Sequence, residues 1–481
     1  MKKKFLSSKD FLWLSLTLLI PLTLFFLLPV TPNDYWWYLR LGGEIAQTHA
    51  VPAIETFSYT QAGQPMVYHS WLAALLFFWV YELGGITLTV FLGGLLIART
   101  YGLLWSMMRE MGAGPRLAGL ITLAAVLPGS INWAMRPQLF AYPLFAWSLW
   151  ILWCWQQGTK RDLWALSLIA LFWVNLHGSF VLLILLIGVG IVFGTGERKS
   201  LLFALGGVFL VTLVNPRGWH VWEYVVTSLI TTSNQAFSRE WMPPVNEGWQ
   251  MNLFFAWILV FMAVAGLSSR KLSRVEWAWA LGFGWLAFSG LRYGIWLLFI
   301  LAPLSASLLV DWGNQRLDRR PQGGIPQMDI ALGILFLLMP LSLLPGFRSA
   351  WWTQAPPVLS ADTPIIATEW LREHPELPDP IWADLSFSSY MVYALPERPV
   401  WIDTRFEVYP PEHWENYEAV NNASWNWESL LDADQINVLM LSQMAQDELI
   451  NAVNASEDWC QLHQDEQANI YARMDAGDFC P

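Results

Sequence analysis

A single carboxylate follows the first apolar segment of this chain, in the stretch TPNDYWWYLR (residues 31–40). Asp34 is followed by Tyr35, Trp36 and Trp37, and such rings favour the boundary between lipid and water. A carboxylate at that boundary can accept a proton from a substrate hydroxyl. Aspartate before a helix is also a common N-cap, which stabilises a helix by about 1 kcal/mol. The sequence leaves both interpretations of Asp34 open, the catalytic and the structural.

A second set of residues with chemical potential lies near the ends of other apolar segments. Glu240, in the stretch REW, is either a second candidate carboxylate or half of an ion pair with its neighbour Arg239. Arginine suits the binding of a phosphate because its fork of donors matches the phosphate oxygens. The candidate ligands of a phosphate or a lipid-linked sugar are Arg292, Arg136, Arg239, His69, His177 and Trp37. The alternatives are structural: ion pairs, anchors at the membrane surface and polar contacts between helices.

The composition indicates what kind of protein positions these residues. Of the 481 residues, 55% are hydrophobic and 14% are charged, and the mean hydropathy is +0.37. A soluble protein of this length needs a more highly charged surface. The 32 tryptophans fit a chain with many membrane–water boundaries. The sequence therefore predicts a polytopic α-helical membrane protein.

Several apolar runs are long enough to cross a bilayer, some of them only as tilted or re-entrant pairs. We expect about eleven spans, the first of which is retained rather than cleaved as a signal peptide. The runs lie at residues 11–30, 86–107, 116–133, 138–155, 163–176, 179–194, 200–214, 250–267, 276–291, 293–310 and 328–345.

The basic residues are distributed unequally between the loops that join these runs. One set of alternate loops carries 16 of the 27 Lys and Arg residues, whereas the opposite set carries arginines but no lysine. The positive-inside rule then places the N-terminus in the cytoplasm of a multi-pass protein of the inner (plasma) membrane. An odd number of spans places the C-terminal part outside the cytoplasm. There Cys460 and Cys480 could form a disulfide.

A change in charge divides the chain into a predicted membrane domain, residues 1–349, and an acidic domain, residues 350–481. The acidic domain holds 23 acidic and 4 basic residues, a net charge of −19, whereas the membrane domain has a net charge of +8. Neither domain has the basic stripe of a nucleic-acid-binding protein. Alternating strand-like and helical stretches predict that the acidic domain is a small α/β domain. The strands are expected at 381–383, 399–403 and 438–441, and the helices at 363–373, 412–420 and 443–453.

Two of the outside loops, residues 31–85 and 215–249, are long. After Asp34, apolar residues recur at spacings of three and four, which predicts a helix lying on the membrane surface. A second such helix is expected over residues 70–81, and a third after Trp219. Because functional residues are often found on loops held by a rigid scaffold, these loops are the expected place of a site.

The other charged residues of the outside segments have weaker claims to a functional role. Glu44 and Glu55, in the first loop, are expected to face solvent. Asp384, Asp403 and Arg405 lie at the ends of predicted strands, where they could contact a ligand. The alternative for these three residues is solvation or an internal ion pair.

Several segments resemble a bacterial group in the C-type glycosyltransferase (GT-C) superfamily. The first is the outside loop DYWWYLRLGGEIAQTHAVPAIETFSYTQAGQPMVYHSWLAALLF. The others are RPQLF, NLHGSF, NPRGW, REW and DLSFSSYMVYALPERPVWIDTRFEVY, in the same order as in that group. The resemblance covers nearly the whole chain. It implies a multi-span enzyme that uses polyprenyl-phosphate-linked sugars.

The resemblance also implies a role for Asp34. GT-C enzymes place an acid in the first outside loop, where it acts as a base on the acceptor hydroxyl or helps to hold a divalent metal, here Mg or Mn. Asp34 matches that position. Two residues depart from the pattern: Tyr38 stands where a histidine is often found, and Ser70 stands where a glutamate often follows His69. The second departure weakens a metal-assisted or two-carboxylate version of the site.

The interpretation that follows is an integral-membrane glycosyltransferase that moves a sugar from a polyprenyl-phosphate donor to an extracytoplasmic acceptor. No His/Cys cluster in the sequence has zinc-ligand spacing, which argues against a structural zinc site. The sequence has no Gly-rich nucleotide loop, which fits a lipid-linked donor and argues against a sugar nucleotide. One alternative is a transporter or flippase of a lipid-linked glycan, for which internal repeats and charges deep in the spans are expected. Another is a non-catalytic envelope assembly protein, in which Asp34 is dispensable.

Overall fold

The computed structural model describes residues 7–158, 162–230, 237–318 and 325–480. The chain divides into two compact units. The helical unit comprises three stretches of chain, residues 1–28, 80–219 and 238–355. The mixed unit comprises residues 29–79, 220–237 and 356–481. Each unit is therefore built from segments that are far apart in the sequence.

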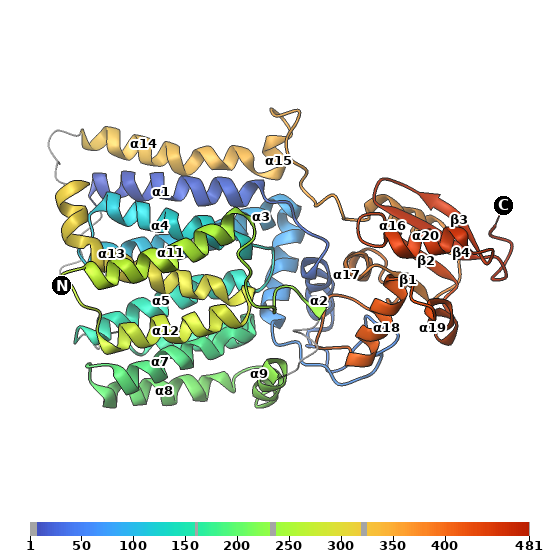
Figure 1. Ribbon diagram of the computed structural model, residues 1–481, viewed down its shortest axis with the longest axis horizontal. Coiled ribbons are helices and arrows are strands. Elements are labelled where there is room, and N and C mark those ends of the chain that lie inside the picture. The colour runs from blue at the N-terminus through green and yellow to red at the C-terminus, as the bar shows by residue number, and fades with distance from the viewer. Residues whose placement is uncertain (1–6, 159–161, 231–236, 319–324, 481) are drawn as a thin grey trace. The chain divides into compact units, whose positions relative to one another are not determined.

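The helical unit consists of apolar helices that lie side by side (Figure 1). Each predicted apolar run coincides with one of these helices. They are α1 (Ser8–Leu27), α3 (Trp71–Glu110, from Val80 on), α4 (Pro115–Gly129), α5 (Gln138–Gln156), α6 (Ala165–Leu176), α7 (Val181–Phe193), α8 (Arg198–Thr212), α11 (Gly248–Leu267), α12 (Arg274–Ser289), α13 (Gly294–Arg316) and α14 (Pro326–Leu338).

The apolar character of these helices extends to their outer faces. Within the described residues, five helical segments are long and apolar enough by themselves to span a membrane: α1, α3, α11, residues 291–316 and residues 326–343. Leu267 is 89% exposed and Trp285 is 78% exposed. Such a surface is unfavourable in water and fits contact with lipid. The protein is a membrane protein, as predicted, and the number of crossings stays a prediction.

The mixed unit contains a small four-stranded sheet in the order β1-β2-β4-β3. β1 (Ile381–Ala383) pairs in parallel with β2 (Val438–Ser442), and β4 (Ala468–Arg473) pairs antiparallel with both β2 and β3 (Trp459–Gln464). The predicted strands at 381–383 and 438–441 are thus confirmed. Five helices accompany the sheet: α16 (Ile365–Glu373), α17 (Leu385–Ala394), α18 (Pro411–Asn421), α19 (Trp427–Ala433) and α20 (Asp447–Ala455).

The predicted strand at 399–403 is wrong. This segment makes only an isolated bridge, between Val400 and Ser58 of the first loop. The apolar run is instead buried beside the sheet, where Trp401 packs on Trp382 with ring centroids 4.5 Å apart. The apolar composition of residues 399–403, which resembles that of a strand, reflects their burial. The backbone of this segment pairs with Ser58, some 340 residues away, rather than with a strand of the sheet.

The mixed unit also includes the predicted surface helices. α2 (Asp34–Thr48) confirms the helix expected after Asp34, α3 begins at Trp71, and α9 (His220–Ile230) confirms the helix expected after Trp219. α2 packs closely on the start of α3, since a Cβ on Gly42 would lie 2.2 Å from the carbonyl oxygen of Ala74. Gly85, with φ 58°, lies at a bend in α3 that separates the first turns from the apolar span.

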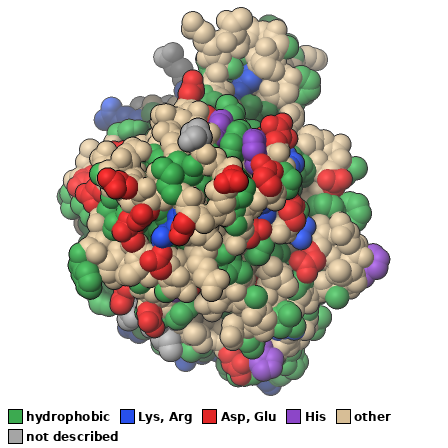
Figure 2. All heavy atoms as spheres, turned by 90° about the vertical axis from the view of Figure 1, so that its right-hand side faces the viewer, with side chains coloured by type: hydrophobic (Ala, Val, Ile, Leu, Met, Phe, Trp, Pro, Cys, Tyr) green, Lys and Arg blue, Asp and Glu red, His purple; other side chains and the backbone are tan. Residues whose placement is uncertain are grey.

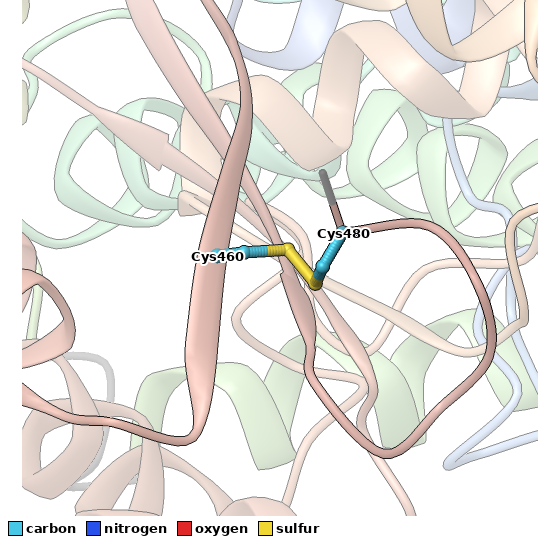
Figure 3. The surroundings of a disulfide bond; sticks show 2 residues. All are labelled: Cys460 and Cys480. Atoms are coloured by element: carbon cyan, nitrogen blue, oxygen red, sulfur yellow. A yellow bond between two sulfur atoms is a disulfide. The ribbon is translucent and has the colours of Figure 1, made fainter.

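The C-terminal segment is held by a disulfide between Cys460 on β3 and Cys480, whose Cα atoms are 5.8 Å apart (Figure 3). The sequence left this bond open, and the structure forms it. Figure 2 shows many acidic and few basic side chains on the face that it presents. This surface agrees with the acidic composition of residues 350–481.

Candidate functional site

Asp34 is the first residue of α2, and the N-cap of that helix is Asn33. The structural interpretation of Asp34 as the N-cap is therefore wrong. Its Oδ1 atom accepts a hydrogen bond from the hydroxyl of Thr404, 2.8 Å away, and a longer one from the indole Nε1 of Trp37, 3.4 Å away. Thr404 is 370 residues distant in the sequence.

Thr404 is itself held in place by α17. The hydroxyls of Ser389 and Thr404 lie 2.8 Å apart, and the amide of Thr404 donates to Ser389 Oγ at 3.3 Å. Because the Thr404 hydroxyl donates its hydrogen bond to Asp34, it accepts the hydrogen bond that it shares with the Ser389 hydroxyl. The chain of hydroxyls fixes the orientation of the Asp34 carboxylate. Aromatic packing of Trp36 on Tyr390, with centroids 4.9 Å apart, holds α2 beside α17.

Next to Thr404, a buried guanidinium joins the first loop to the C-terminal segment. Arg405 is 1% exposed and donates to both carboxylate oxygens of Asp403 and of Glu55. The contact from its Nη2 to Glu55 Oε1 is 2.9 Å, and that from its Nε to Asp403 Oδ1 is also 2.9 Å. The hydroxyls of Tyr68 and Tyr409 donate to Glu55 and Asp403, respectively. We call these five residues the Arg405 network.

The Arg405 network shows that Glu55 is buried and that Asp403 and Arg405 form an internal ion pair. Glu55 is only 2% exposed, so the expectation that it faces solvent is wrong. The internal ion pair, which was the alternative for Asp403 and Arg405, is what forms. Asp384 likewise has an internal role, since it accepts the amide of Ser386 at 2.8 Å as the N-cap of α17. Burial raises the pKa of Asp384, and its hydrogen bonds oppose that rise.

His69 and Trp37 contribute to the mixed unit in different ways. The His69 ring stacks on Tyr224 of α9, with centroids 4.4 Å apart. Trp37 is 5% exposed, and the Arg405 guanidinium lies 5.7 Å from the centroid of its ring. Trp37 is therefore a buried hydrogen-bond donor to Asp34, whereas His69 is half-buried and a ligand can reach it.

The helical unit contains a second polar group, built around Glu240. The sequence offered Arg239 as its partner, but Arg239 is exposed and Glu240 pairs instead with Arg136. Glu240 also accepts the backbone amide of Arg292 at 3.0 Å through its carbonyl, and the Arg292 guanidinium lies 4.3 Å from the Trp241 ring centroid. Burial alone would raise the pKa of Glu240, but Arg136 and Arg292 outweigh it and lower the pKa.

These contacts give the Glu240 group a definite electrostatic character. Arg136 and Arg292 carry two positive charges against the single negative charge of Glu240. An anion such as a phosphate would balance the remaining charge. A carboxylate whose pKa is lowered by two arginines is a weak base, so the geometry favours Glu240 as the residue that orients Arg136.

His177 lies at the break between α6 and α7. It is the N-cap of the short 3-10 helix Gly178–Phe180, and its Nδ1 lies 3.0 Å from the amide nitrogen of Ser179 and 2.7 Å from the Ser179 hydroxyl. These contacts describe a local structural role, which was one of the two interpretations of this residue.

A divalent cation at Asp34 would need several further oxygen or nitrogen ligands. Within the described ranges, no group of three or more His, Cys, Asp or Glu side chains could hold a metal ion. Glu55 and Asp403, the acids of the Arg405 network, are engaged by Arg405. The described residues around Asp34 therefore do not fit a resident metal.

Sequence reasoning missed Thr404, Ser389 and the pairing of Glu55 with Arg405. Ser389, Thr404 and Arg405 lie in the segment DLSFSSYMVYALPERPVWIDTRFEVY and Glu55 lies in the first loop; both segments belong to the resemblance, but neither indicates which residues are partners. Contacts that join residues about 350 positions apart are invisible to local patterns.

Comparison with known proteins identifies the fold. No family model matches the sequence, and no curated protein matches it. Among solved structures, the chain is similar to the archaeal oligosaccharyltransferase AglB from Archaeoglobus fulgidus in complex with an inhibitory peptide and a dolichol-phosphate. That match has a TM-score of 0.59 and 12% identity, and it covers 96% of this chain and 74% of the other.

Two further structures of the Archaeoglobus fulgidus oligosaccharyltransferase match similarly. One is tethered to an acceptor peptide containing the NVT sequon (TM-score 0.59, 11% identity, 96% and 74% covered), and one is the apo form (TM-score 0.57, 12% identity, 97% and 75% covered). These matches cover nearly all of this chain, so it shares the fold of these oligosaccharyltransferase structures.

Proposed function

We propose that this chain is an integral-membrane glycosyltransferase that moves a sugar from a polyprenyl-phosphate donor to an extracytoplasmic acceptor. The observation that carries the proposal is the setting of Asp34, oriented by Thr404 at the start of α2. The fold supports it, because the similar structures are oligosaccharyltransferases, one with dolichol-phosphate and one with an acceptor peptide.

In the proposed reaction, Asp34 removes the proton from the acceptor hydroxyl as its oxygen attacks the anomeric carbon of the donor sugar. The bond between that carbon and the phosphate oxygen breaks, and its electron pair leaves with the polyprenyl phosphate. The products are the glycosylated acceptor, with inverted configuration, and the free lipid phosphate. The proton rests on Asp34 and passes to solvent.

Within the helical unit, we propose that the Glu240 group binds a phosphate. Arg136 and Arg292 supply the positive charge, and Glu240 orients Arg136. Arg239, which is exposed beside them, supplies further positive charge. The aromatic and apolar surfaces of the helical unit supply contacts for the lipid chain.

The proposed orientation places the N-terminus in the cytoplasm and the mixed unit outside it. The disulfide between Cys460 and Cys480 supports that placement, because such bonds persist in oxidising compartments. The excess of basic residues in one set of loops supports it as well.

The proposal is tested by Asp34→Asn. Membranes that contain the full-length chain receive radiolabelled undecaprenyl-phosphate-linked glucose, mannose or galactose, and label that leaves the lipid fraction for envelope acceptors is measured. We expect the variant to lose transfer by about 100-fold or more, because the base is lost.

Glu44→Gln is the matched control, since Glu44 lies on the same helix and its substitution makes the same change of charge. It should transfer at a rate within about twofold of wild type. Protein amount and thermal stability are measured for both variants. Transfer by Asp34→Asn at the rate of the control, from an equally folded protein, would refute the assignment of Asp34 as the base.

A further inference from the structure

One acid near Asp34 has no role in the mechanism above. Glu407 lies three residues after Thr404, in the segment that Thr404 and Arg405 hold against α2. Its Oε1 atom accepts a hydrogen bond from the hydroxyl of Tyr224, 3.0 Å away and 183 residues distant in the sequence. A solvated surface acid needs no such partner. The contact indicates that the position of Glu407 is determined by the fold.

The surroundings of Glu407 are those of a ligand-binding acid rather than of a core residue. Glu407 is exposed on one side, whereas its neighbour Arg405 is buried. Tyr224 holds one oxygen of the carboxyl group and stacks on the half-buried ring of His69. A carboxyl group offers about four lone-pair sites, so capacity remains for a ligand. Three segments of chain, around residues 69, 224 and 407, thus meet at one polar surface.

We infer that Glu407 is a second ligand-binding acid of the Asp34 site and that it hydrogen-bonds a hydroxyl of the donor's sugar. The inference rests on the function proposed above. A sugar ring presents hydroxyls that pair with carboxyl groups and C–H faces that pack on aromatic rings, and Glu407 and the His69–Tyr224 stack offer both kinds of contact. This acid supplies from the C-terminal segment the second carboxyl group that Ser70 does not provide in the first loop.

The electrostatics of the segment agree with this placement. The protein packed around Glu407 desolvates its carboxyl group and raises its pKa, and the nearby charge of Asp34 raises it further. The hydrogen bond from Tyr224 and the charge of Arg405 oppose this rise. Acids whose pKa is raised by burial and by a neighbouring charge are common at binding and catalytic sites. A carboxyl group with a raised pKa can also donate a hydrogen bond to a sugar oxygen when it is protonated.

The test measures binding to lipids that differ only in the sugar. The full-length chain in nanodiscs is titrated with undecaprenyl phosphate and with undecaprenyl-phosphate-linked glucose, mannose and galactose, and Kd is measured by intrinsic fluorescence. We expect wild type to bind at least one sugar-bearing lipid more tightly than the bare lipid. Glu407→Gln should weaken that binding roughly tenfold, as expected for the loss of a hydrogen bond to a charged group. Its affinity for the bare lipid should stay within about twofold.

Two further variants make the result specific. Tyr224→Phe removes the hydroxyl that donates to Glu407, and it should raise the Kd for the sugar-bearing lipid roughly threefold. Glu412→Gln changes the same charge on an exposed residue of α18 and should leave every Kd unchanged.

The outcomes separate this inference from the function on which it rests. Equal affinity of Glu407→Gln and wild type for the sugar-bearing lipid would overturn the role of Glu407. If Glu407→Gln lost as much affinity for the bare lipid as for the sugar-bearing lipid, the role of Glu407 would also be overturned, because the contact would then not involve the sugar. If wild type does not distinguish any sugar-bearing lipid from the bare one, the donor proposal fails and this inference fails with it. The chemistry is checked separately by the loss of transfer expected for Asp34→Asn.

Discussion

The Arg405 network predicts a large and specific loss of stability when its cation is removed. Arg405→Met keeps most of the side-chain volume but leaves the carboxylates of Glu55 and Asp403 buried without a counter-charge. The two acids are 2% and 0% exposed. Breaking a buried ion pair by removing one partner costs about 3–5 kcal/mol, because the remaining charge stays desolvated. For a unit of this size, the loss lowers the melting temperature by about 6–20 °C.

The measurement is thermal unfolding of the full-length chain in detergent, followed by tryptophan fluorescence. The core of the mixed unit contains Trp382, Trp401 and Trp414, so its unfolding changes the signal. The matched control is Arg372→Met. Arg372 pairs with Glu369 on the surface of the same unit, where both side chains are about half exposed. Loss of an exposed pair costs about 0–1 kcal/mol, so the control should melt close to wild type.

A triple variant tests the physical reason for the loss. Glu55→Gln and Asp403→Asn, added to Arg405→Met, remove the two stranded charges and should recover part of the lost stability. Equal melting temperatures of Arg405→Met and the control would refute the reasoning, because they would mean that the carboxylates are solvated. A triple variant less stable than Arg405→Met would show that packing, and not charge, accounts for the loss.

Two further predictions concern the mixed unit. Replacing Cys460 and Cys480 by serine should lower the free energy of unfolding by about 3 kcal/mol, because the disulfide closes a loop of 20 residues. Thermal unfolding with and without a reducing agent checks this prediction. The melting temperature of wild type should fall in the reducing agent, and that of the variant should not change. The pKa of Glu407 is raised above its ordinary value of 4.5, so the folded state holds that proton more tightly and the contribution of Glu407 to stability is lost as pH rises from 4.5 through the raised pKa. The advantage of Glu407→Gln over wild type in melting temperature should therefore increase over that window and then level off, and an advantage independent of pH would contradict the pKa direction.

Local patterns were sufficient for the helices that present the site. α2 follows from apolar residues spaced three and four apart after Asp34, and the periodicity depends on neighbours within one or two turns. The start of α3 at Trp71 and α9 follow from the same kind of signal. Sequence alone could therefore place Asp34 at the start of a helix, beside the end of an apolar span.

The same reasoning failed where the partners are distant. Glu55 lies in a polar loop, so its local surroundings indicate solvent, but Arg405 reaches it from 350 residues away. The strands β3 (WCQLHQ) and β4 (ANIYAR) were missed, because neither shows the regular alternation of apolar and polar residues that indicates a strand. Glu240 was given its neighbour Arg239, while its partner Arg136 lies 104 residues upstream. The failures at Glu55 and Glu240 concern tertiary contacts between residues that are far apart in the sequence.

These contacts bear on the role of the C-terminal segment. Thr404 supplies the donor that orients Asp34, and Arg405 supplies the cation that Glu55 needs in order to be buried. Val400 pairs with Ser58 of the first loop. Without residues 356–481, the first loop would keep a buried carboxylate with no counter-charge and would lose the hydroxyl that holds its catalytic candidate. The C-terminal segment therefore contributes residues to the surroundings of Asp34. It is part of the structure that makes Asp34 a candidate base, because the mixed unit contains both segments.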